Sequence, residues 1–124
     1  EIREALLVLH KTLVESERAE YEKTVGAIPS PSHFLQLLTN DPWFVWLHPL
    51  SHWIVSLDEA LDGKEPLTTA RADVLIGETY RLLTASETGH GFSQQYFAAL
   101  QRDPDVVLAH AAVVKRRVLQ KPSD

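Results

Sequence analysis

Residues 2–24 read IREALLVLHKTLVESERAEYEKT, and this stretch decides the fold class. Its apolar positions recur at spacings of three and four residues: Ile2, Leu6, Leu9 and Leu13. That spacing is the period of an α-helix with one apolar face. The stretch is also rich in Ala, Leu, Glu, Lys and Arg, which all favour helix formation. We therefore predict one long amphipathic helix over residues 2–24, ended by Gly26 and Pro29.

A capping residue followed by proline marks three further helix starts. Such pairs stand at residues 30–31, 41–42 and 103–104. The serine or aspartate oxygen accepts from a free backbone N–H, and proline suits the first helical position because its missing N–H would be unpaired there. The pairs predict helices over residues 31–39, 42–61 and 104–119.

Other capping and helix-breaking residues complete the predicted order of helices. Thr68 is expected to cap a helix that ends near residue 84, and Ser93 to cap a short helix after the following loop. Pro49 lies inside the helix over 42–61 and should kink it. Gly63 follows that helix, where a left-handed residue is common. No segment alternates apolar and polar residues with a period of two, so we predict no sheet.

Four long helices with apolar stripes must bury them against one another. The sequence therefore predicts an all-α fold, an antiparallel four-helix bundle with two additional short helices, formed as a single domain by residues 1–124. Residues 38–42 resemble residues 100–104 at an offset of 62 (103 − 41). This match indicates an internal pseudo-twofold repeat, or two uses of one common helix start. The sequence leaves both interpretations open.

Composition excludes several functional classes. The 44% of apolar residues suffices for a core, and the absence of cysteine excludes disulfides and thiolate metal sites. A net charge of −5 argues against a nucleic-acid partner. The apolar stretch over residues 42–57 is shorter than the roughly 20 residues that cross a membrane. We expect a cytoplasmic protein without a membrane partner, although a targeting segment before Glu1 remains open.

Two polar residues fall near the centre of the apolar stripe in residues 2–24. On a helical wheel these are His10 and Glu17. A buried carboxylate requires a partner, which could be Arg71, Tyr80 or Thr79. His10 and Glu17 are therefore a candidate ligand-binding pair inside the bundle. The alternative, which we favour, is a core polar pair that fixes the helix register.

A second group of polar residues lies on one face of the helix over residues 42–61. His48 and His52 are one turn apart, and Glu59 lies two turns beyond His52. Two histidines at this spacing can chelate a divalent metal, so the three residues are a candidate metal site. A solvated polar stripe is the favoured alternative. We find no catalytic residues in the sequence, and the enzyme class stays unsupported.

Aromatic residues are concentrated in the same helix. The candidate interface residues are Trp43, Phe44, Trp46 and Trp53. Tryptophan dominates many interface hot spots, but rings of this size also form ordinary cores. Because Phe44 lies off the tryptophan stripe, this helix is apolar on more than one face. Such a helix is central in the bundle or forms a dimer interface, and we favour the homodimer.

Residues 41–61 and 100–111 resemble segments of a family of small uncharacterised bacterial all-helical proteins. The resemblance implies a bacterial intracellular helical protein and brings no activity or site residues with it. We predict a non-enzymatic interaction or regulatory module that self-associates. The alternative is a helical bundle that binds a metal or a small ligand.

Overall fold

The computed structural model describes residues 2–63 and 66–115 of this chain. All regular secondary structure in that part of the chain is helical, so the all-α prediction is confirmed. The elements in chain order are α1 (Ile2–Thr24), α2 (Pro31–Asn40), α3 (Pro42–Val45), α4 (His48–Leu61), α5 (Thr69–Leu82), α6 (Phe92–Arg102) and α7 (Pro104–Val114).

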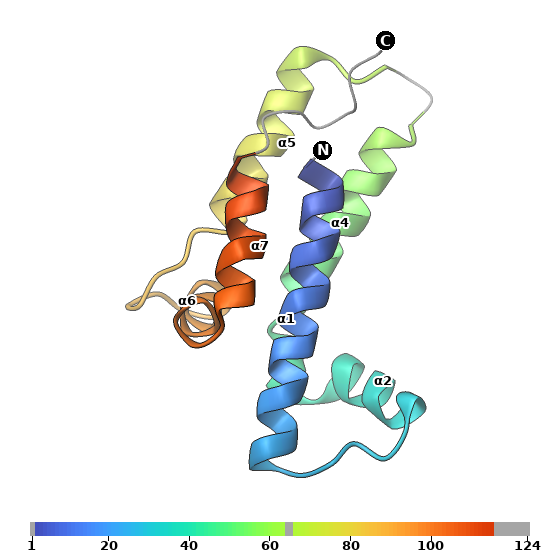
Figure 1. The fold of residues 1–124 in the computed structure, drawn as a ribbon. Helices are drawn as coiled ribbons and strands as arrows, with labels where there is room; N and C mark the ends of the chain where they lie inside the picture. The colour runs from blue at the N-terminus through green and yellow to red at the C-terminus, as the bar shows by residue number, and fades with distance from the viewer. Residues whose placement is uncertain (1, 64–65, 116–124) are drawn as a thin grey trace.

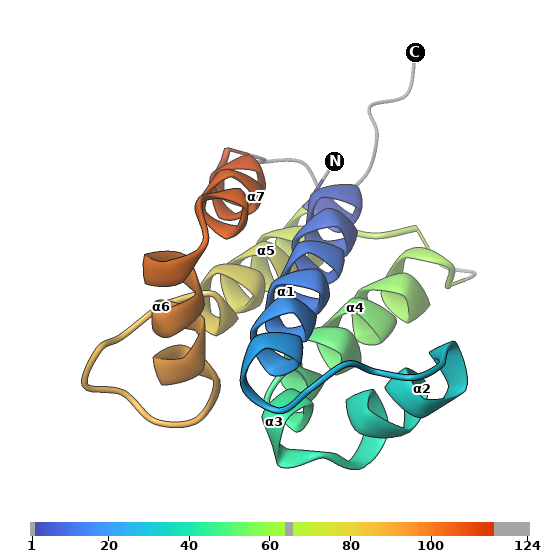
Figure 2. The same ribbon diagram turned by 60° about the horizontal axis from the view of Figure 1, so that its bottom comes forward.

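Helix α1 is the central element of the fold. It packs between α7 and α4, as Figures 1 and 2 both show. In Figure 1 α1 descends from the N-terminus, whereas α4 and α7 rise beside it. Figure 2 shows α5 behind α1, between α4 and α7. The short helices α2 and α6 lie at the lower end of these long helices in Figure 1.

The bounds of α1 agree with the prediction, and its apolar stripe is buried. Four of its leucine and isoleucine side chains are fully enclosed: Ile2, Leu6, Leu9 and Leu13. They belong to one core together with buried residues of α4, α5, α6 and α7. Gly26 follows the helix with φ 144°, a conformation that other residues rarely adopt. The predicted end of this helix before Gly26 is therefore confirmed.

The predicted helix over residues 42–61 is broken rather than kinked. Helix α3 ends at Val45 and α4 begins at His48. Pro49 has no N–H to donate to the carbonyl of Val45, so the helical hydrogen-bond ladder fails one turn before it. In the structure Pro49 occupies the first turn of α4, where the missing N–H costs nothing. The expected single long helix is corrected to two helices.

The predicted capping residues are largely confirmed. The carboxylates of Asp41 and Asp103 accept from the backbone N–H two residues ahead, at 2.8 and 2.9 Å. Ser30 and Thr68 cap α2 and α5 in the same manner, through the N–H three residues ahead.

Ser93 was expected to cap α6, and this expectation is wrong. Gly91 is the cap, with φ 57°, and the Ser93 hydroxyl instead donates to the carbonyl of His90. Gly63 is not left-handed either, since the described glycines with positive φ are Gly26 and Gly91. Among the glycines used to place helix ends, Gly26 is therefore confirmed as left-handed and Gly63 is not.

The two halves of the chain share one helix–turn–helix junction but differ in the helix that follows it. A short helix, a capping aspartate and a proline occur in both halves, at α2–α3 and at α6–α7. Helix α3 stops after four residues, whereas α7 continues to Val114. The predicted extension of the last helix over residues 116–119 lies outside the described residues. The internal repeat stays a prediction.

Candidate functional site

Helix α7 carries apolar side chains on two faces. Its sequence PDVVLAHAAVV has no charged residue between Asp105 and Lys115. One face buries Val106, Ala109 and Val113 in the core. The other face leaves Leu108 69% exposed. A helix that is apolar on both sides normally has neighbours on both sides, and within the described residues the outer face of α7 is open to solvent.

The exposed side chains of α7 and the partly buried Ala111 form a continuous outer face, which we call the α7 face. Its residues are Val107, Leu108, Ala111 and Val114. They recur at spacings of one, three and three residues, so they share one side of the helix. Apolar surface of this kind, bounded by charges, marks interaction sites in many proteins. The sequence does carry a signal for the α7 face. Residues 104–114 are apolar on both sides of the helix, whereas a surface helix is normally apolar on one side.

The aromatic residues predicted for an interface are used inside the chain. Phe44 is fully buried, and its ring packs 5.6 Å from that of Phe34. The Trp53 indole N–H donates to the buried Thr79 hydroxyl at 2.8 Å, which ties α4 to α5. These contacts match the alternative interpretation of the aromatic stripe as core.

Trp43 and Trp46 are half-buried and face different neighbours. The Trp43 ring meets Tyr21 of α1 edge-on at 5.5 Å, and the Trp46 ring lies 5.5 Å from Phe92 of α6. Among the large apolar side chains described in α3 and α4, only Val55 is strongly exposed. The rings of Trp43 and Trp46 therefore have aromatic neighbours within the chain, and their role in an interface stays a prediction.

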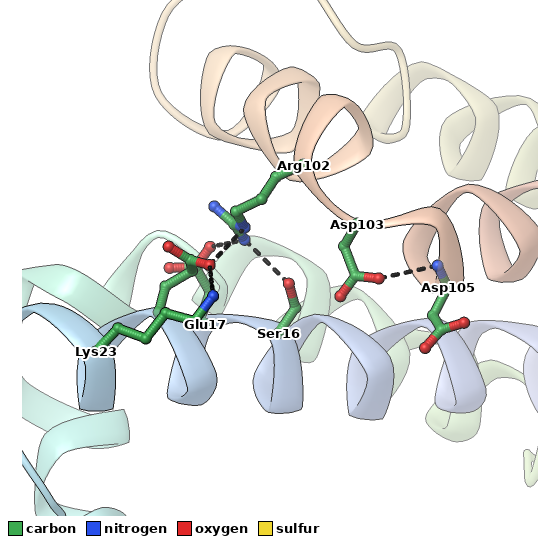
Figure 3. A network of polar contacts seen from close by, with 7 residues as sticks. Ser16, Glu17, Lys23, Arg102, Asp103 and Asp105 are labelled. Atoms are coloured by element: carbon green, nitrogen blue, oxygen red, sulfur yellow. Dashed lines mark hydrogen bonds and ion pairs between the residues drawn. The ribbon is translucent and has the colours of Figure 1, made fainter.

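Glu17 is buried as expected, but its partner is a residue that the sequence did not suggest. Arg102, the last residue of α6, places Nη2 2.7 Å from Glu17 Oε1 and 3.1 Å from Ser16 Oγ (Figure 3). Its Nε lies 3.9 Å from Glu20. The sequence suggested Arg71, Tyr80 or Thr79 as the partner of Glu17. In the structure Arg102 of α6 is the partner. Because Arg102 neutralises Glu17, the pair is a fixed link between α1 and α6.

Three histidines from the two predicted sites line one pocket. His10 of α1 meets His48 and His52 of α4 at a pocket of about 330 Å³. The His48 Nε2–H donates to the Leu38 carbonyl at 2.9 Å, and the His48 and His52 rings lie 5.8 Å apart. Helical packing thus separates His10 from Glu17 and brings it to the other pair.

Glu59 does not join these histidines. It lines a separate pocket near the end of α4, together with Gly63 and Arg71. Within residues 2–63 and 66–115, no three His, Asp or Glu side chains gather where they could hold a metal ion. The predicted trio of His48, His52 and Glu59 is therefore not assembled.

A tyrosine–histidine pair joins α6 to α7, and sequence reasoning missed this contact. The hydroxyl of Tyr96 lies 2.6 Å from His110 Nδ1, within hydrogen-bond distance. Burial raises the pKa of Tyr96 and lowers the pKa of His110, so both groups stay neutral near pH 7. No local sequence pattern predicts this contact, because it depends on how the turn at Asp103 orients α7 against α6.

Acid is expected to destabilise the protein through two histidines. Burial lowers the pKa of His10 and of His110 below the usual 6.5. Near pH 6 the unfolded chain therefore binds more protons, so the free energy of unfolding falls as the pH drops through 6.5. Urea unfolding at about pH 7.5 and about pH 5.5 measures the loss. Replacing both histidines by Asn should flatten the dependence, whereas His90→Asn in the exposed loop should not; equal slopes would contradict this cause.

No protein-family model, curated protein or solved structure matches this chain. The resemblance to small bacterial helical proteins therefore stays a prediction. In the part of the chain that the structure describes, no helix combines the length and apolarity that crossing a bilayer requires. Function is accordingly inferred from the geometry of the surfaces and pockets above.

Proposed function

We propose that this protein is a non-enzymatic interaction module that self-associates through the α7 face. The observation that carries the proposal is the exposure of Leu108, 69%, on a helix whose opposite side is already buried. Fully burying one leucine side chain contributes about 1.5–3 kcal/mol, so covering this face contributes favourable free energy to association. The tryptophan segment, which first suggested a dimer, provides the supporting core rather than the contact.

Charge supports a second copy of this chain as the occupant. Asp105 lies at the start of α7 and the exposed Lys115 directly after its end. If two copies pair about a twofold axis near Ala111, their α7 helices run antiparallel. Leu108 of each copy then lies opposite Val114 of the other, and Asp105 lies at the same end of the contact as Lys115 of the other copy. The opposite charges at the two ends of α7 thus favour an antiparallel second copy.

We further propose that α1, α4, α5 and α7 form the predicted antiparallel four-helix bundle. The alternating directions of successive long helices in Figure 1 support this arrangement. The link between Trp53 and Thr79 supports it as well, since it joins α4 to α5. A bundle of this kind leaves α7 at its edge, where a second copy has access. We also propose that the protein is cytoplasmic, as the resemblance to bacterial helical proteins implies.

Two matched variants test self-association. Leu108→Glu places a charge in the centre of the α7 face, and Leu35→Glu makes the same change at a leucine of α2 that is 64% exposed. Light scattering on the wild type at micromolar concentration should report a mass above 14.0 kDa that approaches twice that value. Leu108→Glu should reduce it to 14.0 kDa, whereas Leu35→Glu should not. A wild type that stays at 14.0 kDa would sink the proposal.

A further inference from the structure

The pocket lined by His10, His48 and His52 has a composition that favours one class of ligand. Its apolar wall includes Leu38 and the buried Leu47. Its volume of about 330 Å³ lies at the lower end of the range for small-molecule sites. An apolar wall beside clustered polar groups suits an amphiphilic molecule of modest size.

The polar groups of this pocket include imidazole N–H donors and no carboxylate that would compete for them. None of its lining residues is Asp, Glu, Lys or Arg. The His48 Nε2–H is already used by the Leu38 carbonyl, which fixes that ring as a wall. No hydrogen bond within the described residues engages the rings of His10 or His52. Each of these two imidazoles therefore has an N–H to offer.

The two available donors come from different helices and lie at different depths. His10 of α1 is half-buried, whereas His52 of α4 is exposed at the rim. The His52 ring is flanked by the ring of His48 at 5.8 Å. A carboxylate has two oxygens that can each accept a hydrogen bond, so it can bridge donors from two helices.

We propose that this pocket binds a small monocarboxylate with an apolar tail. The tail lies against Leu38 and Leu47, and the carboxylate accepts hydrogen bonds from His10 and His52. A metal ion is a poorer occupant, because the described acidic and histidine side chains do not converge in threes. A phosphate dianion is a poorer occupant than a monocarboxylate, because it brings twice the negative charge into a pocket that no Arg or Lys lines.

Octanoate is the probe, and octanol, which has the same chain and no carboxylate, is its control. Isothermal titration on the full chain should show saturable octanoate binding, with octanol at least roughly tenfold weaker, the effect of losing about 1.4 kcal/mol. Equal binding of the two compounds would overturn the role of the carboxylate. Absence of octanoate binding at millimolar concentration would overturn the site.

Histidine variants locate the binding. His10→Leu and His52→Leu, which remove the N–H donors, should each weaken octanoate at least threefold, whereas His33→Leu, at an exposed position of α2 outside the pocket, should leave it unchanged. Because His52 is exposed, His52→Leu should remain folded, and its circular dichroism spectrum should match that of the wild type. Zn²⁺ titrated alone serves as the competing ligand: binding of Zn²⁺ but not octanoate would replace the proposal by a metal site. Leu108→Glu should retain octanoate binding, which separates this proposal from self-association.

Discussion

Leu9→Ala is expected to lower the free energy of unfolding by about 2–5 kcal/mol. Leu9 is fully buried on α1, the helix that packs against both α4 and α7. Truncation removes apolar contacts and leaves a cavity that the surrounding helices can fill only in part. Urea unfolding followed by circular dichroism at 222 nm measures the effect.

Leu7→Ala is the matched control for Leu9→Ala. Leu7 lies two residues away on the same helix and is 49% exposed. The helix propensities of leucine and alanine are similar, so this change should shift stability by less than about 1 kcal/mol. Similar losses for both variants would mean that the buried and exposed faces of α1 are assigned incorrectly.

Arg102→Ala is expected to destabilise the protein by about 2–3 kcal/mol. The change leaves the Glu17 carboxylate, whose side chain is 8% exposed, without its partner at 2.7 Å. Breaking a buried ion pair costs about 3–5 kcal/mol, and the 31% exposure of the Arg102 side chain reduces this figure. Urea unfolding again provides the measurement.

Two controls separate the loss of the buried pair from the loss of an arginine. Arg81→Ala breaks an exposed pair with Glu78 and should cost no more than about 1 kcal/mol. The double variant Glu17→Leu with Arg102→Leu should recover stability to within about 1 kcal/mol of the wild type, because apolar residues replace buried ion pairs well. If the double variant were less stable than Arg102→Ala, the interaction would be more than a register-fixing link.

Local features of this chain were predictable because their causes lie within a few residues. The stripe from Ile2 to Leu13 sets the helical period, and its burial follows from that period alone. Asp41 and Asp103 cap helices because the accepting oxygen and the donating N–H are two residues apart. These signals need no knowledge of the remaining fold.

Side-chain partners across helices were not predictable from the sequence. Glu17 and Arg102 are 85 residues apart, and only the tertiary fold brings the end of α6 beside α1. His10 was grouped with Glu17 because both lie near one stripe, but the contact between α1 and α4 places it beside His48. Such contacts depend on how the helices pack. A helical wheel shows which residues share a face, but it does not show which other helix lies against that face.

The aromatic segment shows a different limit of sequence reasoning. Trp43, Trp46 and Trp53 attract attention as interface residues, but large rings also bury the most apolar area in a core. The exposed surface instead belongs to α7, whose small and β-branched residues look unremarkable in sequence. Exposure is a property of the packed molecule, so composition alone could not separate the two segments.

Cysteine cross-linking at α7 tests the central claim, that two copies meet through the α7 face about an axis near Ala111. The chain contains no cysteine, so one introduced thiol reports one position. A disulfide requires Cα atoms within about 7 Å, which only a direct contact provides. Under mild oxidation Ala111→Cys should form a covalent dimer rapidly, whereas Ala98→Cys on the exposed side of α6 should stay monomeric on the same timescale. Cross-linking at Ala98 that equals or exceeds cross-linking at Ala111 would contradict the account.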